Sequence, residues 1–257
     1  MAHVFDNNDH MASSVVLEEV SVLSPAGDAI VDDLSLRIEP GQAVALVGRS
    51  GAGKTTILRL LNGLTVPRSG RVAIDDVELD GGDLSARRRR IGTILQAPAL
   101  FPHRTVYDNV ATVPRLLEWP EERIRSAAGE ILERLGMPID RFGRRFPRSL
   151  SGGEQQRIGI ARAMIAGPTL LLCDEPFSAL DPLVRHELQE EFVALRDRGG
   201  VTMLFVTHDL GEAVRVGRRI VLMERGAIVC DLRRDDFLRS DLPLVRQFIE
   251  ASRLPEP

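Results

Sequence analysis

The sequence contains a single lysine, only two cysteines and no long apolar run. It has 257 residues, and 33 of them are lysine or arginine, yet Lys54 is the one lysine. No stretch approaches the ~18 apolar residues that cross a bilayer, so we expect no membrane-spanning helix. Cys173 and Cys230 lie in apolar segments away from any cysteine and histidine cluster. This placement argues against a disulfide or a metal site and favours buried, reduced thiols.

The charge balance excludes further classes of protein. The formal net charge is −4 at pH 7, so the surface is not a broad basic footprint for nucleic acid or a membrane. Residues 1–14 are polar and lack the apolar segment of a signal peptide. We expect a disordered arm over residues 1–14 and one domain over residues 15–257.

The lysine lies in a glycine-rich segment that predicts phosphate binding. The segment fits the pattern Gly-x4-Gly-Lys-Ser/Thr, in which the lysine reaches the β- and γ-phosphates and the hydroxyl holds Mg²⁺. Its glycines let the backbone come close to phosphate, and successive N–H groups form a concavity for an anion. The helix that follows adds its positive N-terminal dipole. The expected phosphate-binding residues are Gly48, Arg49, Ser50, Gly51, Ala52, Gly53, Lys54, Thr55 and Thr56, with Thr55 also on the metal.

Apolar runs around this loop predict an α/β fold with a mostly parallel sheet. Residues 43–47 lead into the loop as a strand, and residues 57–61 leave it as a helix. Unbroken apolar runs at 170–173 and 201–206 flank a helical segment, which predicts a βαβ unit buried on both faces. Residues 97–160 predict a helical insertion. A small antiparallel layer is expected from strands at 15–23, 34–38, 71–74 and 77–79.

Two carboxylates follow the apolar run at 170–173. Strands of open α/β sheets end at the edge where ligands bind, so Asp174 and Glu175 should lie near the phosphate loop. A carboxylate there can hold Mg²⁺, which is the role we expect for Asp174. The neighbouring Glu175 can then act as the general base that polarises an attacking water.

A second segment, Leu-Ser-Gly-Gly-Glu-Gln-Gln-Arg over residues 150–157, also favours an anion. Ser151 can cap the helix that follows, and glycines at the start of a helix leave N–H groups facing outward. From these residues alone the segment is either a second phosphate site or an ordinary capped helix.

Segment 150–157 and three other segments together resemble the motif set of ATP-binding-cassette ATPases. The resemblance covers the chain from about Val15 onward. Residues 150–155 resemble the signature motif, and Gln96 resembles the glutamine of the Q-loop. Asp181, in Ser-Ala-Leu-Asp, resembles the D-loop aspartate. His208, in Val-Thr-His-Asp, resembles the switch histidine.

The resemblance implies that ATP is the nucleotide, with Mg²⁺, and that two copies form a head-to-tail dimer. Each ATP would then lie between the phosphate loop of one copy and the signature segment of the other. Gln96 would sense Mg²⁺ and the attacking water, His208 would contact the γ-phosphate, and Asp181 would cross the dimer interface. The signature residues expected at the nucleotide are Ser151, Gly152, Gly153 and Glu154.

The residues weigh against two other phosphate-loop classes. A kinase leaves the signature segment and His208 unexplained. A DNA-repair or chromosome ATPase interrupts its cassette with long coiled coils, and no sustained heptad run occurs here. The compact spacing favours the ATPase subunit of an importer. Because no membrane span is expected, the resemblance implies a separate permease that docks beside Gln96 and the helical insertion, at the cytoplasmic face of the membrane.

Finer features bear on the solute and on the base. Segments 100–103, 113–119 and 188–192 resemble importer ATPases for osmoprotectants such as glycine betaine, carnitine and choline. Importers of amino acids are the alternative, and a substrate-binding protein would take part indirectly in either case. Many relatives place an aromatic residue on adenine where this chain has Leu23-Ser24-Pro25. We therefore expect either loose base selectivity or an apolar contact from Leu23.

Overall fold

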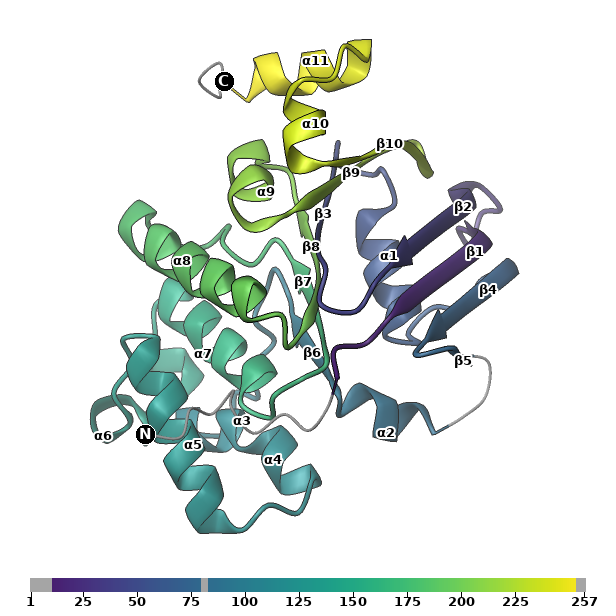
Figure 1. The fold of residues 1–257 in the computed structure, drawn as a ribbon. Helices are drawn as coiled ribbons and strands as arrows, with labels where there is room; N and C mark the ends of the chain where they lie inside the picture. Colours follow the sequence, from purple (N-terminus) through teal and green to yellow (C-terminus); the bar gives the residue numbers. More distant parts are fainter. Residues whose placement is uncertain (1–10, 80–82, 253–257) are drawn as a thin grey trace.

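The chain folds around a six-stranded sheet, which carries the parallel strands that the sequence predicts (Figure 1). The computed structural model describes residues 11–79 and 83–252. The strand order is β10-β9-β3-β8-β7-β6, and every neighbouring pair is parallel except β10 with β9. These strands are β3 (Ala43–Gly48), β6 (Ile91–Ile94), β7 (Leu170–Asp174), β8 (Thr202–Thr207), β9 (Arg219–Glu224) and β10 (Ala227–Arg233).

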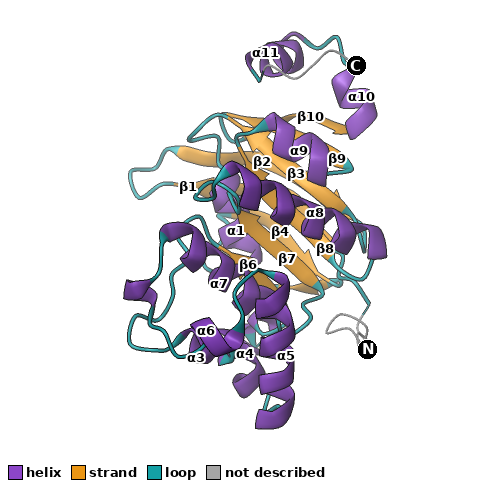
Figure 2. Ribbon diagram, turned by 90° about the vertical axis from the view of Figure 1, so that its left-hand side faces the viewer, coloured by secondary structure: helices purple, strands orange, loops and turns teal. Residues whose placement is uncertain are grey.

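Both faces of this sheet are covered, as its unbroken apolar strands require. Alternate residues of β3 enter two different cores. Ala45 and Val47 join the core under the helices α7, α8 and α9, whereas Val44 and Leu46 join the core shared with helix α1 and the second sheet. Figure 2 shows α7, α8 and α9 lying across the sheet on one side. The helices are α1 (Lys54–Leu61), α7 (Gly152–Met164), α8 (Pro182–Arg198) and α9 (Leu210–Val216).

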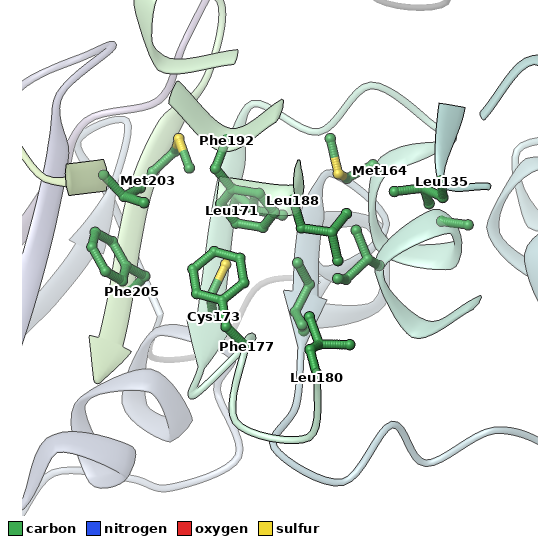
Figure 3. Close-up of a cluster of buried hydrophobic side chains, with 14 of the residues drawn as sticks. Leu135, Met164, Leu171, Cys173, Phe177, Leu180, Leu188, Phe192, Met203 and Phe205 are labelled. Atoms are coloured by element: carbon green, nitrogen blue, oxygen red, sulfur yellow. The ribbon is translucent and has the colours of Figure 1, made fainter. Parts of the chain in front are cut away.

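The core under α8 anchors the segment that follows β7 (Figure 3). The Phe177 and Phe192 rings meet edge to face, with centroids 5.0 Å apart, and both side chains are fully buried. Cys173 lies beside them as a buried, unpaired thiol, and burial raises its pKa. Cys230 is also buried and unpaired, so both thiols lie as we expected.

A second sheet is antiparallel, with the order β2-β1-β4-β5. The turn between β4 and β5 falls at Asp75 and Asp76, whose positive φ angles of 53° and 59° suit a tight hairpin. This sheet confirms the predicted antiparallel layer. Its strands are β1 (Val15–Leu23), β2 (Ala29–Ile38), β4 (Ser69–Ile74) and β5 (Val77–Glu78).

The helical insertion is confirmed, and it is built from several short helices. Its first two are α3 (Val106–Val110) and α4 (Thr112–Leu116), which are separate rather than one continuous helix. Pro114 has no N–H for the carbonyl of Val110, so a single regular helix cannot run through both. The insertion continues past residue 160 to the end of α7. The other described helices are α2 (Leu84–Arg88), α5 (Glu121–Arg134), α6 (Ile139–Phe142), the 3₁₀ turn Pro147–Ser149, α10 (Arg234–Leu238) and α11 (Pro243–Ala251).

The structure corrects the expected arm over residues 1–14. Residues 1–10 lie outside the described residues, but Ser13 is only 2% exposed. Its N–H donates to the Thr169 carbonyl at 3.1 Å, and its hydroxyl lies 2.7 Å from the Thr169 hydroxyl. The Ser14 N–H donates to Asp75 at 2.8 Å. Residues 13 and 14 are therefore part of the fold. The sequence did not predict this, because their hydrogen-bond partners lie far away in the sequence.

Within residues 11–79 and 83–252, no helix is both long enough and apolar enough to span a bilayer.

Candidate functional site

Most of the predicted site residues gather around one cavity of about 450 Å³. It lies at the carboxyl ends of β3, β6, β7 and β8, where the chain leaves each strand. Its lining residues are Ile30, Ser50, Gly51, Ala52, Gly53, Lys54, Thr55, Thr56, Gln96, Asp174, Glu175, Val206 and His208.

A larger cavity, of about 940 Å³, lies at the other ends of the strands, by the start of β3 and β9. It is lined by arginines, but Arg218, Arg219 and Arg234 are each ion-paired with an aspartate. No predicted site residue is among its described lining, so we place the chemistry in the smaller cavity.

The phosphate loop joins β3 to α1, and its backbone requires glycine at two points. Gly53 has φ of 95°, and a Cβ there would lie 2.7 Å from the Ile30 carbonyl oxygen. At Gly48, with φ of 154°, a Cβ would collide with the Met223 carbonyl oxygen. The motif glycines thus let the loop lie against β2 and β9, as the predicted close backbone approach requires.

The Lys54 ammonium is folded back onto its own loop. Its Nζ donates to the Gly48 carbonyl at 2.7 Å and to the Arg49 carbonyl at 3.0 Å. The side chain is 8% exposed. Burial lowers the pKa of Lys54, against the opposing fields of Glu175 and Asp174. The ammonium is held by neutral carbonyls, so an anion entering the loop offers it stronger partners.

Asp174 ends β7 and faces the first turn of α1. Its Oδ2 accepts a hydrogen bond from the Thr55 hydroxyl at 3.0 Å. Burial raises the pKa of Asp174, while the Thr55 hydrogen bond and the nearby Lys54 lower it. A hydroxyl and a carboxylate side by side are the oxygen donors that Mg²⁺ prefers. The two residues therefore fit the metal position that the sequence predicts.

The Glu175 carboxylate contacts two other predicted residues, His208 and Gln96, which lie far from it in sequence. Its Oε1 is 2.9 Å from His208 Nδ1, and its Oε2 accepts from Gln96 Nε2 at 3.3 Å. Glu175 has a φ of 46°, which is uncommon for a residue with a side chain. Its N–H is bonded to the Val206 carbonyl at 2.9 Å, which fixes this conformation. Such strained residues cluster at functional sites.

The predicted signature residues lie outside this cavity in the single chain. Ser151 caps α7: its hydroxyl accepts from the Glu154 N–H at 3.2 Å, and Glu154 accepts from the Ser151 N–H at 2.7 Å. This capping box lowers the pKa of Glu154. An added Cβ at Gly152 would meet no described atom within 4 Å. Asp181 is likewise an N-cap, accepting from two N–H groups of α8.

Three side chains at or next to the cavity were not predicted from the sequence. Ile30 of β2 lines the cavity, whereas Leu23 is not among its described lining residues. Thr207, which precedes His208 in the chain, donates a hydrogen bond to the Glu212 carboxylate at 2.6 Å. An isolated isoleucine, threonine or glutamate carries no sequence signal for such a place.

Comparison with known proteins agrees with this geometry. Residues 31–178 match the ABC transporter family. The glycine betaine/carnitine/choline transport ATP-binding protein OpuCA of Bacillus subtilis (strain 168) is 43% identical, over 93% of this chain. This chain spans 63% of the length of OpuCA. The glycine betaine uptake system ATP-binding protein YehX of Escherichia coli (strain K12) is 40% identical, over 87% of this chain and 73% of its own.

A solved structure shows the same fold. The ATP-binding cassette MJ0796, a dimer in a post-hydrolysis state bound to ADP and Pi, superposes with a TM-score of 0.78 at 31% identity. The match covers 85% of this chain and 98% of that one. Sequence and structure lead to one assignment: this chain belongs to the ABC transporter family.

Proposed function

We propose that this chain binds ATP with Mg²⁺ and hydrolyses it as the energising subunit of an importer. The observation that carries the proposal is the convergence of Gln96, Glu175 and His208 at the cavity that also holds Lys54 and Thr55. Phosphoryl transfer needs positioning and charge stabilisation more than covalent chemistry. The cavity supplies a cation, a polarising base and donors from separate elements.

Each side chain has a definite task in this reaction. Lys54 leaves its two carbonyl partners for the β- and γ-phosphates, which are stronger acceptors. Glu175 orients and polarises the attacking water, as a base held within hydrogen-bond reach. His208 contacts the γ-phosphate. Thr55 and Asp174 would hold Mg²⁺, which would supply positive charge for the phosphate oxygens, and Gln96 would sense that position.

A head-to-tail dimer accounts for the residues outside the cavity. Ser151 and Gly152 are exposed at the start of α7, where the N–H groups and the dipole favour an anion. In a dimer they complete the γ-phosphate site of the partner copy, with Gly153 and Glu154 beside them. Asp181 is exposed next to the same surface and crosses to the partner. The similar cassette MJ0796 forms a dimer.

The proposed partner in the membrane is a permease, which leaves this chain peripheral on the cytoplasmic face. Leu95, beside Gln96, is 40% exposed, and Phe101 in the insertion is 38% exposed. Both side chains would be accessible to a helix of the permease. OpuCA is named for the transport of glycine betaine, carnitine and choline, and YehX for the uptake of glycine betaine. We therefore propose an osmoprotectant of this kind as the solute, delivered by a separate binding protein. Nucleic acid has no part in this proposal.

The test is the mass in solution of Glu175→Gln, with and without Mg-ATP. The change removes the base and keeps the shape of the side chain, so ATP should accumulate and the dimer with it. We expect a shift from monomer to dimer on adding ATP. The same substitution combined with Lys54→Met is the matched control and should stay monomeric. A Glu175→Gln variant that turns over ATP at the wild-type rate would rule out the proposed base.

A further inference from the structure

A buried acid is hydrogen-bonded to Thr207, the residue that precedes His208 in the chain. Glu212, in the first turn of α9, is 7% exposed. Its Oε2 accepts a hydrogen bond from the Thr207 hydroxyl at 2.6 Å, and Thr207 itself is 1% exposed. Buried carboxylates are rare because burial removes their hydration. An acid kept at such a place needs a reason beyond packing.

The Thr207 hydroxyl fixes the turn that carries His208. It donates to Glu212 and accepts from the Asp209 N–H at 3.1 Å. Asp209 in turn caps α9, accepting from the Gly211 N–H at 2.7 Å and the Glu212 N–H at 3.2 Å. His208 follows Thr207 and precedes Asp209 in the chain, and its side chain is 67% exposed. Its only described side-chain hydrogen bond is to Glu175.

Charged neighbours on α8 and on the turn before α9 act on the pKa of Glu212. Burial raises the pKa of Glu212; the Thr207 hydrogen bond opposes this most, followed by the fields of Arg185 and His208, and Asp209 adds to it. Arg185 lies on α8, which packs against α9, and donates to the Leu180 carbonyl at 3.3 Å. The buried Nε of Arg185 has no acceptor among the described residues.

We propose that Thr207 and Glu212 are positioning residues, which hold the turn so that His208 points at Glu175 and at the γ-phosphate. The inference rests on the proposed function, because it gives His208 a task in ATP hydrolysis. Neither residue is among the described lining of the nucleotide cavity, so both act through His208, which is. A displacement of about 1 Å at a reacting group can cost ~100-fold in rate, which makes a rigid turn worthwhile.

A network that only stabilises the fold would explain the same contacts, and the chain offers a matched control. Thr202 begins β8, the strand that Thr207 ends. Thr202 is 0% exposed. Its hydroxyl donates to the Ser13 carbonyl and accepts from the Gly41 N–H at 2.9 Å. Both threonines therefore bury a doubly bonded hydroxyl on one strand, and only Thr207 adjoins His208.

The experiment compares Thr207→Val, Thr207→Ser and Thr202→Val in the full chain. We expect Thr207→Val to lower kcat for ATP about 10-fold, with KM within about twofold, and Thr207→Ser to recover most of the rate. Thr202→Val should lower the melting temperature without lowering kcat. In a His208→Ala background, Thr207→Val should cost less than about twofold more, because coupled residues are not additive.

The outcomes separate the two proposals. If His208→Ala hydrolyses ATP at the wild-type rate, the proposed function of His208 fails and the inference fails with it. If His208→Ala is slow but Thr207→Val matches Thr202→Val in kcat, only the positioning role is refuted. The positioning role would also be refuted if Thr207→Val lowered kcat by the same factor in the His208→Ala background as in the otherwise wild-type chain. Glu212→Ala gives a second route to each result, since it removes the same bond from the other side.

Discussion

Replacing Lys54 by methionine should abolish most of the ATP affinity and leave the fold nearly unchanged. Lys54 is 8% exposed, and its ammonium donates to two loop carbonyls at 2.7 and 3.0 Å. Methionine keeps the length and apolar stem of the side chain, but it leaves both carbonyls without that donor. It also relieves the desolvation that lowers the pKa of Lys54. These effects oppose each other, so we expect the free energy of unfolding to change by less than about 1 kcal/mol.

The affinity for ATP has no such compensation. Binding exchanges two neutral carbonyl acceptors for anionic phosphate oxygens, and bonds between two charged partners are about twice as strong as neutral ones. We expect the exchange to contribute about 2–3 kcal/mol to binding. The dissociation constant should therefore rise about 30- to 140-fold, at tenfold per 1.4 kcal/mol.

The assay is titration calorimetry with Mg-ATP in the Glu175→Gln background, where turnover does not blur the isotherm. Thermal unfolding gives an independent readout. ATP at 100 times its dissociation constant should stabilise the parent by about 2.7 kcal/mol, or roughly 5–11 °C for a chain of this size. At the same concentration, the Lys54→Met chain should gain less than about 1 kcal/mol.

Lys54→Arg separates the size of the cation from its charge. Arginine keeps the positive charge but presents a wide planar fork, which the loop around Gly48 and Gly53 has little room to hold. We expect this variant to bind ATP nearly as weakly as Lys54→Met. Unchanged ATP affinity in Lys54→Met would refute the role of Lys54, and unchanged affinity in Lys54→Arg would refute the reasoning from a compact charge.

Two further predictions concern stability. Burial raises the pKa of Asp174 above its ordinary value of 3.8, so the folded chain favours the neutral form, and the charged form costs stability as pH rises through the raised pKa. Asp174→Asn should therefore melt at a higher temperature than wild type at neutral pH and lose that advantage below pH 3.8. The same variant should hydrolyse ATP at least ~100-fold more slowly. An equal gain in melting temperature at low pH would show that the charge of Asp174 is not the cause. Gly53→Ala should lower the free energy of unfolding by about 2–4 kcal/mol, because its Cβ meets the Ile30 carbonyl oxygen and its φ is positive. Gly51→Ala, with φ of 80° but no described atom within 4 Å, should cost only about 1 kcal/mol in denaturant unfolding, and equal costs would show that the contact with Ile30 has no effect.

Several parts of this protein follow from the sequence because their signals are local. The phosphate loop depends on glycines and one lysine within nine consecutive positions, and the structure places Lys54 and Thr55 at the cavity as predicted. The acids that end β7 were predictable for a similar reason, since a run of apolar residues followed by carboxylates marks the edge of a parallel sheet. The resemblance extended this reading to Gln96 and His208.

Elsewhere local patterns misled or were silent. Residues 13 and 14 are polar and were expected in a loose arm, yet their hydrogen-bond partners at Asp75 and Thr169 make them part of the fold. Pro114 cannot donate to the Val110 carbonyl, and the insertion there forms two short helices, α3 and α4, in place of one. Ile30 has no motif, and it reaches the cavity only because β2 passes close to the phosphate loop.

The sequence by itself determined which chemical groups the site contains, and the tertiary structure decided how they meet. Gln96 and Glu175 are 79 positions apart, and Glu175 and His208 are 33 apart. They touch because β6, β7 and β8 are adjacent and parallel, so the three carboxyl ends open at one edge. Strand order and register arise from packing across the whole core, which no single segment encodes.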